Sequence, residues 1–167
     1  MSEAPRPSDE QTTPVHDARA LLRTHLERDG AELALVIDTA GRVITAAGNP
    51  GRLDPTAFAS VCAAHFEANV QLATLVGEPE FRTLLHQGHE ASIYLAGVGS
   101  SAVLALVYEG TRLFEEVGPG GLELARQLTD PIAEFLGKSV GAGAAGVGSE
   151  WVQAVENEIE RVFREGA

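Results

Sequence analysis

Three glycines near the C-terminus form a literal GxGxxG, the spacing that lets a backbone approach the pyrophosphate of a dinucleotide: Gly141, Gly143 and Gly146. That chemistry requires a strand before the glycines and a helix beginning among them. Here the glycines follow a helical pattern and lie within a run of small residues, and the chain has no GxxxxGK[ST] phosphate loop. The sequence therefore predicts no direct nucleotide binding.

Two groups of residues containing histidine could in principle do other chemistry. His86 and His89 are three residues apart and Glu90 is adjacent, but the pattern has no third cluster of metal ligands. Ser60, Cys62, His65 and Glu67 lie together on a predicted helix, without a group to orient the histidine or an oxyanion donor. We therefore interpret both sets as structural, and we expect no metal, no cofactor and no active site of the protein's own.

Four arginines lie at predicted turns or strand edges, where each could reach a partner's active site as an arginine finger: Arg42, Arg52, Arg82 and Arg112. An arginine in such a place is more often a solvated charge, and the sequence selects none of the four.

The charge balance argues against nucleic acid as the main partner, because 12 Lys and Arg stand against 24 Asp and Glu, a formal net charge of −12. No apolar run approaches the ~20 residues that cross a bilayer, so no membrane insertion is expected. The single cysteine, Cys62, cannot form an internal disulfide. We predict a cytoplasmic protein with one folded domain.

Periodicity and capping signals divide the chain into four parts. Residues 1–12 contain almost no apolar side chains to bury and are predicted to be a disordered tail, and residues 13–137 are predicted to fold. Residues 138–149 are a Gly/Ala-rich linker, and residues 150–167 form a separate C-terminal helix.

The folded part is predicted to hold three helices and five strands, an α+β domain. Within it, helices are expected from Pro14 to Asp29, over 55–76 and over 122–136, with strands over 33–38, 43–47, 81–86, 92–96 and 102–108. Gly118–Gly121 should break the early part of the third helix, and Pro131 should kink or restart it.

The predicted helix over 55–76 has apolar residues on more than one face. One stripe holds Phe58, Val61, Cys62, Leu72, Leu75 and Val76, and a neighbouring stripe holds Ala59, Ala63, Phe66, Val70 and Ala73. A surface helix of a monomer needs one such stripe. Either this helix is central to the core or one stripe meets another chain, and we expect a homodimer.

The C-terminal segment has an amphipathic pattern, with large apolar residues at Trp151, Val155, Ile159, Val162 and Phe163. The stripe can pack back on its own domain or insert into a hydrophobic groove of a partner, and we favour the partner. The opposite face is acidic, which would suit a partner groove with a basic rim.

Several stretches resemble the roadblock family of dynein light chain relatives, in particular its bacterial MglB-like branch. The resemblance rests on LVIDTAGRVITAAG, LDPTAFAS, LATLVGEPEF, LHQGHEASIY and VLALVY, and on the C-terminal WVQAVENEIERVF. It implies a five-stranded antiparallel sheet sandwiched between helices. It also implies a homodimer formed through the second helix and the adjoining third strand.

The same resemblance implies an MglA-like small GTPase of the Ras family as partner, in cell polarity or gliding motility, with a cell pole as one place of action. The protein would raise GTP hydrolysis by positioning the GTPase's own catalytic residues, and the C-terminal helix would promote nucleotide exchange. The implied GTPase-binding residues are Ala64, Glu67, Ala68, Gln71, Trp151, Val155, Ile159, Val162 and Phe163, and the implied dimer residues are Phe66, Val70, Ala73 and Phe81.

One departure from the family keeps a second function open. MglB-like proteins have small residues where this chain has Glu67 and Gln71. Bulk at these positions could redirect docking. The alternative is a roadblock scaffold that assembles a polarity or signalling complex without accelerating hydrolysis.

Overall fold

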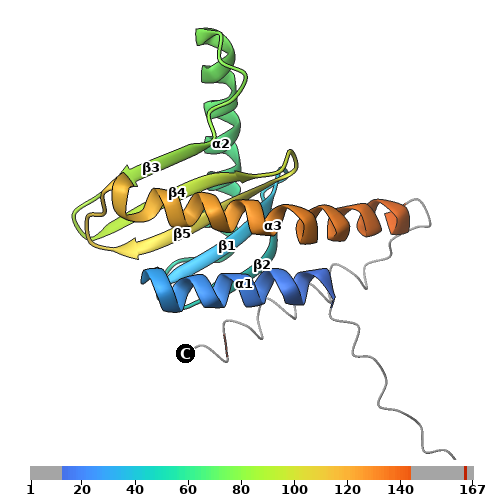
Figure 1. Cartoon of the computed structure of the whole chain (residues 1–167), viewed down its shortest axis with the longest axis horizontal. Coiled ribbons are helices and arrows are strands. Elements are labelled where there is room, and N and C mark those ends of the chain that lie inside the picture. Colours follow the sequence, from blue (N-terminus) through green and yellow to red (C-terminus); the bar gives the residue numbers. More distant parts are fainter. Residues whose placement is uncertain (1–12, 144–163, 165–167) are drawn as a thin grey trace, which may run out of the picture.

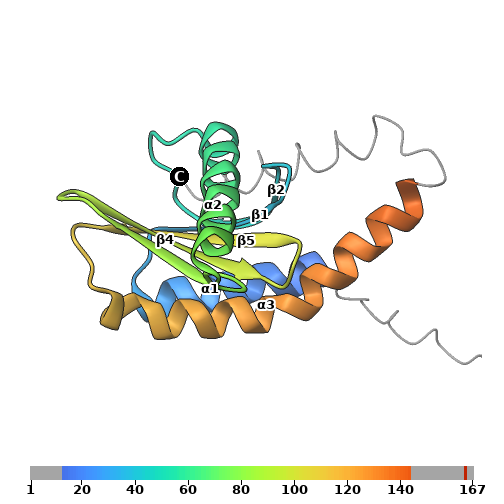
Figure 2. The same ribbon diagram turned by 90° about the horizontal axis from the view of Figure 1, so that it is seen from above.

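The computed structural model describes residues 13–143 and residue 164, and within them it has the predicted α+β fold, an antiparallel five-stranded sheet with helices on both faces (Figure 1). The elements are α1 (Pro14–Asp29), β1 (Leu33–Asp38), β2 (Val43–Gly48), α2 (Pro55–Val76), β3 (Thr83–Gln87), β4 (Ala91–Val98), β5 (Ala102–Glu109) and α3 (Phe114–Gly143). The strand order is β2-β1-β5-β4-β3, so β2 and β3 are the edges. Seen from above, α1 and α3 cover one face while α2 stands on the other (Figure 2).

The two faces of the sheet are covered to different extents. Large side chains such as Leu22, Leu106 and Leu128 fill the layer beneath α1 and α3. On the other face α2 meets the sheet through the small residues Ala59 and Ala63, with the partly buried Phe58 and Phe66 packed against the same cluster. A single helix on this face leaves much of its own surface uncovered. α2 accordingly projects well beyond the sheet (Figure 1).

The ends of α2 are where the sequence predicted them. The side chain of Asp54 accepts hydrogen bonds from the backbone N–H groups of Thr56 (2.9 Å) and Ala57 (3.2 Å), which satisfies donors that the first turn leaves free. Gly77 ends the helix at φ +77°, a left-handed conformation that favours glycine. These signals are local, and they hold even though α2 projects beyond the sheet (Figure 1).

The starts of α1 and β3 differ from what local signals in the sequence predict. Thr13 has a hydroxyl suited to cap the helix that begins at Pro14, and it precedes α1 in an extended conformation, but its side chain makes no capping hydrogen bond. The edge strand was expected to begin at residue 81, yet β3 begins at Thr83. The carbonyl of Phe81 instead accepts a hydrogen bond from Nδ2 of Asn69 on α2 (3.4 Å), so the segment before β3 is held by α2.

The third helix differs most from its prediction. α3 runs without interruption from Phe114 to Gly143, with Pro119 and Pro131 inside it, and its last residues extend into the range predicted as linker. Close packing against the sheet explains why a glycine is present in this helix, because a Cβ on Gly121 would collide with the Tyr94 ring. Glycine has a poor helix propensity, but it lets α3 approach the sheet where a side chain has no room.

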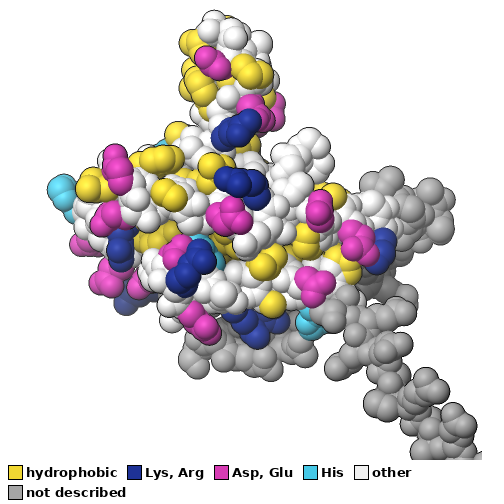
Figure 3. Space-filling view, in the orientation of Figure 1, with side chains coloured by type: hydrophobic (Ala, Val, Ile, Leu, Met, Phe, Trp, Pro, Cys, Tyr) yellow, Lys and Arg dark blue, Asp and Glu magenta, His cyan; other side chains and the backbone are white. Residues whose placement is uncertain are grey.

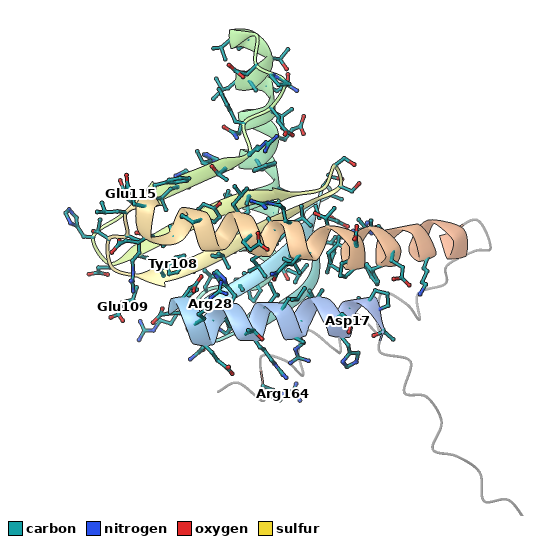
Figure 4. All side chains as sticks on the ribbon, in the orientation of Figure 1. Asp17, Arg28, Tyr108, Glu109, Glu115 and Arg164 are labelled. Carbon is teal, nitrogen blue, oxygen red and sulfur yellow. The ribbon has the colours of Figure 1, made fainter. Side chains whose placement is uncertain are left out.

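A polar group is buried between α1 and β5. His25 is 2% exposed, its Nδ1 lies 3.1 Å from a carboxylate oxygen of Asp29, and its Nε2 lies 3.5 Å from the hydroxyl of Tyr108. Figure 4 shows the labelled Tyr108 near the end of α1 where Arg28 is labelled. Burial lowers the pKa of His25, and the negative charge of Asp29 opposes this shift only in part. His25 is therefore a buried group that resists protonation.

Candidate interaction surface

The outward side of α2 carries an apolar stripe with large aliphatic side chains in the open. Val61 is 66% exposed, Leu72 55%, Leu75 81% and Val76 66%. At about 100° of rotation per residue, these positions share one side of the helix with small residues and one histidine. We call this set the outer stripe: Ala57, Val61, Ala64, His65, Ala68, Leu72, Leu75 and Val76. Figure 3 shows hydrophobic side chains gathered on the projecting part of α2.

The outer stripe shows that α2 is not central to the core, which was one of the two possibilities that the sequence left open for this helix. One apolar side of α2 packs on the sheet through Ala59, Cys62 and Ala63, and the large aliphatic side chains of the other side are 55–81% exposed. An aliphatic surface of this kind on a projecting helix is typical of a protein interface.

Four predicted partner-binding residues lie together on α2, and all are exposed. Ala64 and Ala68 belong to the outer stripe, while Glu67 and Gln71 lie on its flank. Nε2 of Gln71 donates a hydrogen bond to Oε1 of Glu67 (3.2 Å), one helical turn apart. The flank is thus a polar border to an apolar surface.

The residues predicted to form the dimer interface lie elsewhere. Ala73 is fully buried within its own chain and has no surface to offer a partner. Phe66, Val70 and Phe81 are half-buried. Phe66, Val70 and Ala73 belong to the second apolar stripe of α2, and only the tertiary structure determines that this stripe is the more buried of the two.

Phe66, Val70 and Phe81 line a groove of about 450 Å³. Its lining also includes residues of the β4–β5 region and of α3. Arg82 and Arg126 lie on its lining together with Glu67 and Glu80, so charges of both signs border it. The groove therefore has no net electrostatic preference that would identify an occupant.

Two histidines that the sequence separates by 21 positions meet at the outer stripe, to which His65 belongs. The ring centroids of His65 on α2 and His86 on β3 lie 4.6 Å apart, with the ring planes at 78°. Loss of hydration around His86 lowers its pKa, and the nearby charge of His65 lowers it further. His86 was considered with His89 and Glu90 from their spacing, but its ring contact is with a helix that no spacing rule connects to it.

Cys62 is not placed to act as a nucleophile. It is buried against the sheet, and burial raises the pKa of its thiol to about 11, so the reactive thiolate is scarce at neutral pH. Among the described residues, no three or more His, Cys, Asp or Glu are grouped so that they could hold a metal ion.

Three of the four candidate arginines bond within their own chain. Nε of Arg42 donates to Asp38 (2.8 Å) and Nε of Arg82 to Glu80 (3.0 Å). Arg112 lies over the Tyr108 ring at 5.7 Å and donates to the carbonyl of Glu109. Arg52 is exposed in the turn before α2.

The C-terminal partner-binding residues predicted from the sequence lie outside the described part of the chain: Trp151, Val155, Ile159, Val162 and Phe163. The predicted tail over 1–12 also lies outside it. Among the described helices, none has the length and apolar character that a membrane span requires.

Comparison with known proteins gives a consistent result. A profile of the Roadblock/LC7 domain matches residues 19–108, which is more than half of the chain. The structure is similar to that of the gliding protein MglB from Thermus thermophilus (29% identity, TM-score 0.67, covering 72% of this chain and 92% of that one). MglB from Myxococcus xanthus is 29% identical, with a TM-score of 0.65 and coverage of 70% and 95%.

A third similar structure is described as MglB with a tetrameric arrangement; it is 30% identical, with a TM-score of 0.67 and coverage of 72% and 91%. A search of curated proteins found no significant match.

Proposed function

The chain belongs to the Roadblock/LC7 family, and we propose that it is a homodimeric regulator of an MglA-like small GTPase, in cell polarity or motility. The observation that carries this proposal is the outer stripe of α2, an uncovered apolar surface on a domain similar to MglB. The protein would act without an active site of its own. It would accelerate GTP hydrolysis by holding the GTPase's own catalytic residues in place.

The stripe supports a homodimer because it can be self-complementary. In a symmetric dimer the same patch from each protomer forms the contact, and two α2 helices lying antiparallel would each cover the other's stripe. The large aliphatic residues Val61, Leu72, Leu75 and Val76 are 55–81% exposed. Covering them would contribute about 5 kcal/mol per protomer before the cost of association. The free edge of β3 lies beside α2 and continues the same surface.

The flank of the stripe supports a GTPase site next to the dimer contact. Once two α2 helices lie side by side, Glu67 and Gln71 of each protomer border a surface that spans both. Ala64 and Ala68, which the resemblance assigns to the GTPase, belong to the outer stripe and would lie in the dimer contact. A partner on this surface can be stabilised in the arrangement of its switch regions that hydrolyses GTP. If the dimer stabilises that arrangement of the switch regions by ~3 kcal/mol, the rate of GTP hydrolysis rises on the order of a hundredfold.

Arginine contacts favour this positioning mechanism over an arginine finger. Arg42, Arg82 and Arg112 each bond to a group of their own chain. Any of these three would have to leave its bond to act as a finger, whereas Arg52 is exposed in the turn before α2. The proposal assigns the catalytic groups to the GTPase and the geometry to this protein.

The experiment follows phosphate release by the small GTPase encoded nearest to this gene, with and without the protein. Faster turnover supports the regulator. Binding with unchanged turnover supports the alternative, a scaffold, which the Glu67–Gln71 pair on the docking flank favours.

A matched pair of variants tests the site itself. Gln71→Arg should weaken the effect on turnover and leave the dimer intact. Gln127→Arg is the control, because Gln127 on α3 is also exposed and also donates to a glutamate four residues earlier (Glu123, 3.2 Å). Equal effects of the two variants would contradict the placement of the site on α2.

The C-terminal residues 150–167 enter the proposal as a second contact that binds a separate patch of the GTPase and promotes nucleotide exchange. Its support is the apolar spacing from Trp151 to Phe163 and the resemblance of that segment to the MglB-like branch.

A further inference from the structure

We propose that acid weakens the dimer through four histidines, His65 and His86 of each protomer, gathered near its two-fold axis. The inference rests on the homodimer proposed above and concerns the regulation of the same surface. It would make the assembly, and the GTPase site that spans it, responsive to pH.

The position of His65 along α2 places it near the axis. α2 has 22 residues from Pro55 to Val76, and His65 is the eleventh of them. When two identical helices pair antiparallel over their whole length, the two-fold axis passes their midpoints. Each His65 would then lie close to its counterpart, among the aliphatic side chains of both outer stripes.

His86 brings a second imidazole to the same place. It lies on the edge strand β3, on the sheet face that carries Leu84 and Ile93 and that α2 covers. Its ring contacts that of His65, with centroids 4.6 Å apart. The symmetric pairing would therefore gather two such histidine pairs at one contact.

The charged groups around these rings offer little compensation for a positive charge. On α2 itself, Glu67 is two residues from His65 and points to the opposite side of the helix. On β3 and β4, the neighbours of His86 on this face are Leu84 and Ile93. On β5, Glu109 shares the face only at the far end of the strand, opposite Ala91. His89 and Glu90 are exposed in the β3–β4 turn.

Protonation would therefore oppose the dimer in two ways. Water is excluded from an apolar contact, which disfavours the charged imidazole, and neighbouring charged imidazoles repel one another. The dimer then binds fewer protons than two monomers do in the pH range where histidine titrates. By linkage, its dissociation constant rises as the pH falls through that range.

The test measures the dimer dissociation constant by sedimentation at about pH 7.5 and about pH 5.5, at each pH with and without EDTA. The whole chain should show a rise of at least about tenfold at the lower pH, the change expected for one suppressed protonation across a pH unit. The double variant His65→Gln/His86→Gln should lose this rise. His16→Gln, at an exposed position on α1, should keep it.

Each result bears on a different step. A monomer at pH 7.5 would overturn both the homodimer and this inference. A dimer whose constant does not change with pH would overturn the inference alone. An equal rise of the dissociation constant in the double variant would also overturn the inference, because it would assign the effect to other groups such as His25. A rise that EDTA abolishes would overturn it too, because it would assign the effect to a bound metal ion. Circular dichroism at both pH values shows that the compared species are folded.

Discussion

Truncating one leucine of the outer stripe should weaken the dimer without harming the fold. Leu72 is 55% exposed, so its loss costs the isolated protomer little. Covering that exposed part in the dimer is worth about 1 kcal/mol, and a symmetric contact contains the residue twice. Leu72→Ala should therefore cost about 2 kcal/mol of association free energy, which raises the dissociation constant about thirtyfold.

The chain provides a control of equal exposure. Leu113, directly before α3, is also 55% exposed but lies away from α2. Leu113→Ala removes the same atoms from the same degree of contact with water, so it should leave dimerisation unchanged. Sedimentation of both variants over a concentration series measures the two constants. If Leu72→Ala dimerises as tightly as the unchanged chain, or if both variants weaken to the same degree, the outer stripe is not the contact.

Three further predictions concern the rest of the chain. Phe163→Ala should reduce GTPase binding and exchange while leaving sedimentation of the dimer unchanged; unaltered affinity would assign this residue to local packing. Gly121→Ala should lower the free energy of unfolding by about 1–3 kcal/mol, because the added Cβ would collide with Tyr94. Gly137→Ala, at a position with open space on α3, should raise the free energy of unfolding by about 0.5–1 kcal/mol. Denaturant titrations measure both changes. Burial lowers the pKa of His25 in the folded state, so the contribution of neutral His25 to stability is complete above the unfolded-state pKa near 6.5 and is lost as the pH falls below that value. The free energy of unfolding, measured from pH 7 to pH 5, should therefore decrease. His25→Gln should make this decrease smaller.

Local signals in the sequence were sufficient for most of the elements. The cap at Asp54, the proline after it and the glycine at position 77 set the bounds of α2, because each acts on the backbone within a turn of itself. The confirmed α+β fold and the family followed from short stretches whose pattern is visible without any long-range contact.

The same kind of signal was misleading where packing opposed it. Gly118, Pro119, Gly120 and Gly121 predicted a break, but α3 is helical through them. Helix propensity is worth about 1 kcal/mol for a glycine, and contact with α1 and the sheet outweighs it. The packing reason for these glycines lies in residues far along the chain, such as Tyr94 and Asp29.

The sequence by itself determined that α2 has apolar residues on more than one face. The assignment of Ala64, Glu67, Ala68 and Gln71 on that helix to a GTPase came from the resemblance and stays a prediction. Which side of α2 faces solvent was decided only by where the sheet lies, and Ala73 turned out to be buried. The meeting of His65 and His86 was decided in the same way. The physical reason is that periodicity repeats along one helix axis, whereas the direction of a helix face depends on side chains contributed by strands that the helix meets only after folding.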